Sequence, residues 1–193
     1  MFDVVPVDGA SRRAFLLMPF AFAGLVAVSS TEERPLPTAD GNGSGAEISL
    51  VLFSDAGERQ GEARVRKIAK SEEEWRKELT QPEFLVTRRQ GTEPPFTGRY
   101  ARHKEHGLYR CVCCGNALFR SGERFDSGTG WPSFWSPAAE ANIRTSTSMS
   151  LFMERVEVLC AKCDAHLGHV FRDGPVPTGL RYCINSVALR FRS

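Results

Sequence analysis

Two closely spaced pairs of cysteines constrain this chain more than any other feature of its sequence. Cys111 and Cys114 form one C-x-x-C pair, and Cys160 and Cys163 form the second, with residues 115–159 between them. Each pair lets two thiolates bind one ion from a tight turn, and two such turns complete a tetrahedral zinc site. Because four thiolates close that shell, we expect the zinc to be structural and not catalytic.

Two other interpretations of these cysteines stay open on spacing alone. An exported protein permits disulfides, so each pair is compatible with a cross-link, and C-x-x-C pairs also occur as redox-active thiols. The coincidence of two such pairs in one chain favours zinc. Cys113 lies beside Cys114 and cannot easily join the same shell, so we predict that it is a spare thiol.

The first thirty residues predict an export signal. Arg12 and Arg13 precede an uncharged, mostly apolar run over residues 14–31, which ends in small residues. This order is typical of a signal peptide, and the paired arginines resemble the twin-arginine motif, with Leu17 in place of its lysine. The alternatives are an ordinary export signal and an uncleaved anchor, but the run is short for a membrane span and contains Pro19. We therefore predict an exported, periplasmic protein, tethered to the membrane only if the signal is uncleaved.

The remaining chain divides into three parts. Residues 31–46 are rich in proline, glycine and serine, which predicts a flexible linker. Residues 47–70 form an N-terminal extension, and residues 71–193 are predicted to be the functional domain. A chain of 193 residues suits one domain with a tail, and its hydrophobic fraction of 41% excludes wholesale disorder. The net charge of +2 is too small to indicate nucleic-acid binding.

The domain is predicted to begin with a short helix. Ser71 and Glu74 fit a capping box, and Trp75 and Leu79 lie four residues apart on one helical face. We expect Pro82 to end this helix.

The last hundred residues predict mainly β structure with antiparallel pairing. Turns are frequent, and helical periodicity is absent. Short strand-like runs occur at Ile48–Phe53 in the extension and then at Leu108–Cys111, Thr147–Phe152, Val156–Cys160, His169–Phe171 and Arg181–Arg192.

The sixth cysteine is the best candidate for chemistry. If Arg181–Leu189 is one strand, then Arg181, Cys183 and Asn185 share a face. A cation beside a thiol lowers its pKa and favours the reactive thiolate, and the Asn185 amide is suited to orient a substrate. The alternative is a buried structural cysteine, but polar residues on both sides of it argue against an apolar core.

Two histidines and a glycine-rich turn complete the candidate site. The chain has only four histidines, and His166 and His169 both fall in the segment HLGHVF, shortly after the second cysteine pair. Paired histidines near a rigid metal site are candidates for proton transfer. The segment GTGWPSFW, which contains Trp131, suits either the wall of an apolar pocket or a corner of the core.

These segments resemble a known family. FDSGTGWPSFW, C-x-x-C-G, C-x-x-C followed by HLGHVF, and GLRYCINSVAL are similar to the motifs of the B-type methionine sulfoxide reductases, from about Ser71 to Phe191. The resemblance implies two antiparallel sheets with small helices, zinc on the four paired cysteines, and reduction of the R epimer of methionine sulfoxide in proteins and peptides. Cys183 matches the family's nucleophile, and its substrate-pocket residues match Trp131, His166, His169, Arg181 and Asn185.

The chemistry of these residues agrees with that activity. A sulfoxide sulfur becomes electrophilic when its oxygen is protonated, so the Cys183 thiolate would attack the sulfur while His166 or His169 supplies the proton. Methionine then leaves, and Cys183 becomes a sulfenic acid, which is reversible.

One departure from the family's pattern concerns recycling. Many members carry a resolving cysteine where this chain has Thr129. We therefore predict a one-cysteine type that is regenerated by an external thiol reductant, such as a thioredoxin-like protein. The alternative is that Cys113 resolves the sulfenic acid after a rearrangement.

Two rival classes explain less of the sequence. A non-enzymatic zinc module that binds protein or nucleic acid accounts for the four cysteines but not for Cys183 and the two histidines. A zinc hydrolase would need an open shell with histidine and carboxylate ligands, and no such set is present in the sequence. We predict a monomer that acts on oxidised proteins or peptides and binds no nucleic acid.

Overall fold

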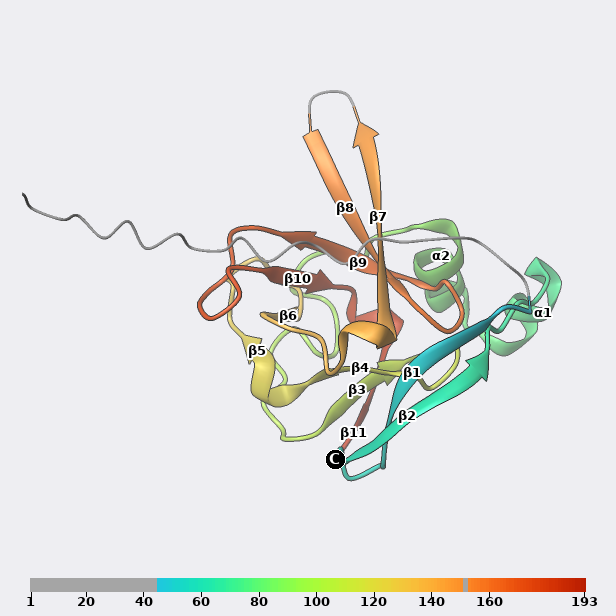
Figure 1. Cartoon of the computed structure of the whole chain (residues 1–193). Helices are drawn as coiled ribbons and strands as arrows, with labels where there is room; N and C mark the ends of the chain where they lie inside the picture. The colour runs from blue at the N-terminus through green and yellow to red at the C-terminus, as the bar shows by residue number, and fades with distance from the viewer. Residues whose placement is uncertain (1–44, 151–152) are drawn as a thin grey trace, which may run out of the picture. The chain divides into compact units, whose positions relative to one another are not determined.

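The computed structural model describes residues 45–150 and 153–193, without the side chains of 148–155 (Figure 1). The predicted export signal and residues 31–44 of the predicted linker lie outside the described residues. Within the described part, no helix is long and apolar enough to cross a membrane.

The described residues are mainly β, and every strand pairing is antiparallel, as predicted. A six-stranded sheet has the order β5-β6-β10-β9-β8-β7, a three-stranded sheet has the order β11-β3-β4, and a hairpin pairs β1 with β2. The strands are β1 (Glu47–Phe53), β2 (Arg59–Arg66), β3 (Leu108–Cys111), β4 (Ala117–Arg120), β5 (Arg124–Phe125), β6 (Ser133–Phe134), β7 (Ile143–Ser150), β8 (Met153–Cys160), β9 (His166–Phe171), β10 (Arg181–Ile184) and β11 (Leu189–Arg192).

The N-terminal extension forms the third sheet and packs on the domain. Val51 and Phe53 of β1 are buried in a small cluster with Leu108 and Ala117. The buried Asn142 side chain joins the two parts, because its amide accepts from the Val51 N–H at 2.8 Å and donates to the Val51 carbonyl at 2.8 Å. The six-stranded and three-stranded sheets are the two antiparallel sheets that the family resemblance implies.

Two short helices precede the larger sheets. The Ser71 capping box is confirmed at the start of α1 (Glu72–Glu78), whose Trp75 is buried. The helix ends before Pro82, which instead lies in the first turn of a second helix, α2 (Gln81–Arg89). Proline suits that position, since the first N–H groups of a helix have no intrahelical acceptor. The first helix thus ends before Pro82, as predicted, but the second helix that Pro82 opens was not foreseen.

Strand β10 is fixed by an aromatic core on one of its faces. Tyr182 is fully buried, with its ring 5.7 Å from Phe119, which stacks on Phe134 at 4.5 Å. Side chains alternate along a strand, so Arg181 and Cys183 lie on the opposite face.

The predicted long strand over Arg181–Leu189 is interrupted. Strand β10 ends at Ile184, and a 3-10 turn, η3 (Ser186–Ala188), separates it from β11. Asn185 caps that turn, so the strand alternation that placed it on one face with Cys183 does not reach it. The prediction of one continuous strand over Arg181–Leu189 was therefore wrong.

Asn142 gives a stability prediction. We expect Asn142→Ala to lower the free energy of unfolding by roughly 2–3 kcal/mol, because it leaves buried backbone groups of Val51 and Ala117 without their partner. Chemical denaturation measures this loss. The exposed Ser49→Ala on the same strand is the control and should change stability by less than about 0.5 kcal/mol. Equal effects of the two substitutions would contradict the anchoring role.

Candidate functional site

Four strands of the large sheet place one row of polar side chains across it. Cys183 on β10 lies directly opposite His169 on β9 and opposite Ser133 on β6. His169 in turn lies opposite Glu157 on β8. Directly opposed residues of antiparallel strands point to the same side, so these four side chains share one face of the sheet.

A glycine allows the two central strands to approach at this row. A Cβ on Gly168 would lie 2.0 Å from the Cys183 carbonyl oxygen, so no other residue fits there without displacing β10. The glycine of the HLGHVF segment therefore sets the position of Cys183 relative to both histidines.

Cys183 is half-buried, and burial and the Arg181 charge act on the pKa of its thiol in opposite directions. Burial raises the pKa of the Cys183 thiol, whereas the Arg181 guanidinium and a hydrogen bond with Thr129 act in the opposite direction. Arg181 therefore acts as predicted, but burial has the larger effect, so the net direction of the thiol pKa is upward.

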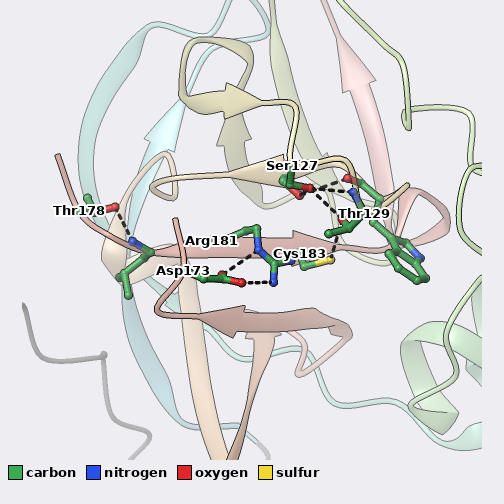
Figure 2. Close-up of polar contacts among 9 residues, drawn as sticks. Ser127, Thr129, Asp173, Thr178, Arg181 and Cys183 are labelled. Carbon is green, nitrogen blue, oxygen red and sulfur yellow. Dashed lines mark hydrogen bonds and ion pairs between the residues drawn. The ribbon is translucent and has the colours of Figure 1, made fainter. Parts of the chain in front are cut away.

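Arg181 is held by a carboxylate that the sequence analysis missed. Its Nε and Nη2 donate to the two carboxylate oxygens of Asp173 at 2.9 Å each (Figure 2). The guanidinium lies 4.3 Å from the ring centre of Phe171. The pair raises the pKa of Arg181 and lowers that of Asp173 through this hydrogen bond. The Asp173 charge also weakens the effect of the arginine on the thiol.

Three hydrogen-bonded hydroxyl groups, of Thr129, Ser127 and Ser133, lead to the Cys183 sulfur. The Thr129 hydroxyl lies 4.0 Å from the Cys183 sulfur, within reach of a weak hydrogen bond, and 2.8 Å from the Ser127 hydroxyl, which lies 2.7 Å from Ser133 (Figure 2). Position 129 thus faces Cys183 directly, and it offers a hydroxyl group there.

His166 is the more buried of the two predicted histidines. Its Nδ1 lies 2.6 Å from a Glu157 carboxylate oxygen, and its buried Nε2 has no partner among the described residues. A carboxylate only accepts, so the proton lies on Nδ1 of His166. The rings of His166 and His169 meet edge to face, with centres 5.4 Å apart. Glu157 was not foreseen, although its position opposite His169 follows from strand register.

Trp131 and Asn185 both contact one backbone segment. The Trp131 indole N–H donates to the Glu93 carbonyl at 3.1 Å, and the Asn185 side chain accepts from the Glu93 N–H at 3.1 Å. Asn185 also donates to the Leu167 carbonyl at 3.0 Å. The Asn185 amide therefore connects the backbone at Glu93, to which Trp131 is hydrogen-bonded, with β9. Glu93 was also missed; its buried carboxylate accepts from two backbone N–H groups of η3.

The four paired cysteines converge, as predicted. Their ligand atoms all lie within 4.8 Å of one another, and all are free thiols. The Cys111–Cys163 and Cys114–Cys160 sulfur distances are 3.7 and 3.5 Å. A tetrahedral shell with bonds of about 2.3 Å separates its sulfurs by about 3.8 Å. The residues therefore fit one metal ion. The Cys113 sulfur contacts the Thr87 hydroxyl at 3.3 Å and also interacts with the Cys111 and Cys163 thiols at the border of the cluster.

Comparison with known proteins gives the family. Residues 79–193 match the SelR domain. The peptide methionine sulfoxide reductase MsrB of Hahella chejuensis is 58% identical over 127 residues, which are 66% of this chain and 91% of that protein. The MsrB of Synechococcus sp. strain RCC307 is 58% identical over 122 residues, 63% and 90% of the two chains. The chloroplastic peptide methionine sulfoxide reductase B1 of rice is 56% identical over 123 residues, 63% and 57% of the two chains.

The fold and these matches define a reductase of the SelR class. The chain belongs to the B-type methionine sulfoxide reductases, as the sequence motifs indicate. The strands β1 and β2 precede the residues matched by the SelR domain.

The charges around Cys183 give a pair of opposed predictions. Asp173→Asn should lower the apparent thiol pKa, because it removes a negative charge that raises it, and alkylation at pH 7 should become severalfold faster. Arg181→Met should raise the apparent pKa and slow alkylation. The rate of iodoacetamide labelling against pH measures both, in a metal-loaded Cys113→Ser background. Shifts of the two variants in the same direction would contradict this electrostatic assignment.

Proposed function

We propose that this protein reduces the R epimer of methionine sulfoxide in oxidised proteins and peptides, with Cys183 as the nucleophile. The observation that carries the proposal is the row in which Cys183 lies opposite His169, with Thr129 4.0 Å from its sulfur. A half-buried thiol surrounded by polar side chains has no role in an apolar core.

In the first step, the Cys183 thiolate attacks the sulfoxide sulfur while the oxygen takes up a proton. The hydroxyl formed on the sulfoxide then passes to the Cys183 sulfur as the bond between the two sulfurs and the original sulfur–oxygen bond break. Methionine leaves and Cys183 becomes a sulfenic acid, so the cysteine is oxidised as the sulfoxide is reduced. Because burial raises the thiol pKa, the thiolate forms most readily when a proton acceptor is close.

The two histidines are the proposed proton donors. Glu157 orients the His166 ring, since its carboxylate accepts from Nδ1 at 2.6 Å. Nε2 of His166 is then the nitrogen from which a proton would reach the sulfoxide oxygen, directly or through His169 or a water molecule.

The other pocket residues position the substrate. Trp131 would contact the methyl group on the sulfoxide sulfur and exclude water. Arg181 would stabilise the thiolate. The Asn185 side chain joins the Glu93 backbone to Leu167 of β9. Because Trp131 donates to the Glu93 carbonyl, Asn185 also fixes Trp131 relative to β9.

Recycling requires a thiol from another molecule. All six cysteines are free, and four of them form the metal-binding cluster. Thr129 faces the Cys183 sulfur at 4.0 Å, so that position offers no thiol to form a disulfide. Two external thiols, or one dithiol such as a thioredoxin-like protein, would reduce the sulfenic acid to the thiol and release water.

The proposed ion in the cysteine cluster is structural zinc. Four thiolates close the tetrahedral shell, so the ion contributes to folding and takes no part in the reaction. The alternatives of two disulfides within the pairs are disfavoured, because the short sulfur distances join cysteines of different pairs.

The proposed location follows from the N-terminal sequence alone. Arg12 and Arg13 before an apolar run support twin-arginine export to the periplasm. A protein exported in the folded state can carry its metal with it. We propose that it acts there as a monomer.

Turnover of resolved epimers tests the proposed reaction. With dithiothreitol as reductant, the protein should reduce peptide methionine (R)-sulfoxide and leave the S epimer unchanged. Cys183→Ser should lose activity by at least about 10³-fold, whereas Cys113→Ser should retain it. Turnover by Cys183→Ser, or preference for the S epimer, would refute the proposal.

Metal content and stability test the zinc site. We expect about one zinc per chain, and Cys160→Ser should lose the metal and several kcal/mol of unfolding free energy. Cys113→Ser is the matched control and should keep both. A metal-free protein of unchanged stability would show that the cluster is not a structural zinc site.

A further inference from the structure

Phe96 is an exposed aromatic residue in a backbone conformation that aromatic residues avoid. Its φ is 66°, in the left-handed region, and its side chain is 59% exposed. The two other described non-glycine residues with positive φ are Gln90, which caps α2, and Asp164, which closes the second cysteine turn. A bulky residue with positive φ is strained, and such strain is commonly found at functional sites.

The ring of Phe96 is held against one glycine. The Phe96 N–H donates to the Gly130 carbonyl at 2.8 Å. A Cβ on Gly130 would lie 2.7 Å from the Phe96 nitrogen and 2.8–2.9 Å from its ring atoms, so the ring packs directly on the Gly130 backbone. Gly130 itself has a φ of +90°, which other residues rarely adopt.

This contact lies at the edge of the active site. Gly130 is between Thr129, whose hydroxyl is 4.0 Å from the Cys183 sulfur, and Trp131. The segment from Glu93 to Phe96 therefore contacts the catalytic loop at two points, through the Glu93 carbonyl and through Phe96.

The fold gains little from this residue. More than half of the ring is exposed, so its burial against Gly130 is incomplete. Asparagine would adopt the positive φ with less strain. An exposed ring next to the loop that carries Thr129 and Trp131 is suited to bind apolar surface of another molecule.

We propose that Phe96, beside Trp131, forms a subsite for an apolar side chain that flanks methionine sulfoxide in the substrate. The inference rests on the proposed function, since the flanking residue enters only when the sulfoxide reaches Cys183. Phe96 is then a specificity-determining residue: it favours oxidised methionines next to leucine or aromatic residues over those next to glycine.

Peptide kinetics on the full chain test this subsite. The substrates are blocked tripeptides of methionine (R)-sulfoxide that carry leucine or glycine on one side, tested separately at the N- and C-terminal positions, with saturating dithiothreitol. We expect wild-type kcat/KM to favour leucine about tenfold on at least one side, as partial burial of a leucine side chain predicts. In Phe96→Asn the ratio of kcat/KM for the leucine and glycine peptides should fall to near one, mainly through KM. Phe96→Tyr, which keeps the ring, should keep the wild-type ratio.

Two controls separate specificity from folding. Leu52→Asn removes another exposed apolar side chain, on β1, and should leave the leucine preference unchanged. Phe96→Asn should unfold at the same denaturant concentration as the wild type or a higher one, because it relieves the positive φ.

Three results would overturn the inference. The first is an unchanged leucine preference in Phe96→Asn. The second is a wild-type enzyme that shows no preference on either side. The third comes from repeating the kinetics with a thioredoxin as reductant. If Phe96→Asn changes only the KM for thioredoxin, then Phe96 contacts the reductant and not the peptide substrate. Failure of the proposed function itself would look different, since the wild type would then turn over neither peptide.

Discussion

Alternation of side chains along β10 is the constraint on which the rest of the site depends. Tyr182 is fully buried against the Phe119 and Phe134 rings, and this packing fixes the strand. Its neighbour Cys183 must then face the other side, where β9 presents His169. Gly168 lets the two strands approach closely enough for that pairing. The packing of Tyr182 in the core thus determines which face of the sheet carries Cys183 and His169.

The thiol is controlled by a balance of opposed effects. Burial disfavours the thiolate, and Arg181 favours it, but Asp173 holds the arginine and reduces that effect. In the proposed mechanism, a thiol of raised pKa keeps its proton until a substrate and an acid–base group are present. The Glu157–His166 pair is placed for proton transfer, because the carboxylate fixes the ring through Nδ1 and leaves Nε2 for exchange. Protection of the resting thiol from oxidation follows from the same balance.

Local patterns predicted much of this molecule, and tertiary contacts account for what was missed. The cysteine pairs, the Ser71 capping box and the mainly antiparallel fold have short-range signals, and all are confirmed. The single strand predicted over Arg181–Leu189 was wrong because a 3-10 turn interrupts the strand-like run. Glu93 and Asp173 were missed because each acts through a partner distant in sequence or across a loop. Such contacts have no local pattern in the sequence from which they could be predicted.

The most direct test of the account is the state of Cys183 after one turnover without reductant. Mass spectrometry of the metal-loaded protein in the presence of dimedone should find one adduct, on Cys183, and no intramolecular disulfide. Thr129→Cys is the matched control, since a thiol placed about 4 Å from the Cys183 sulfur should give a disulfide instead. A disulfide between Cys113 and Cys183 in the wild type would contradict the one-cysteine mechanism.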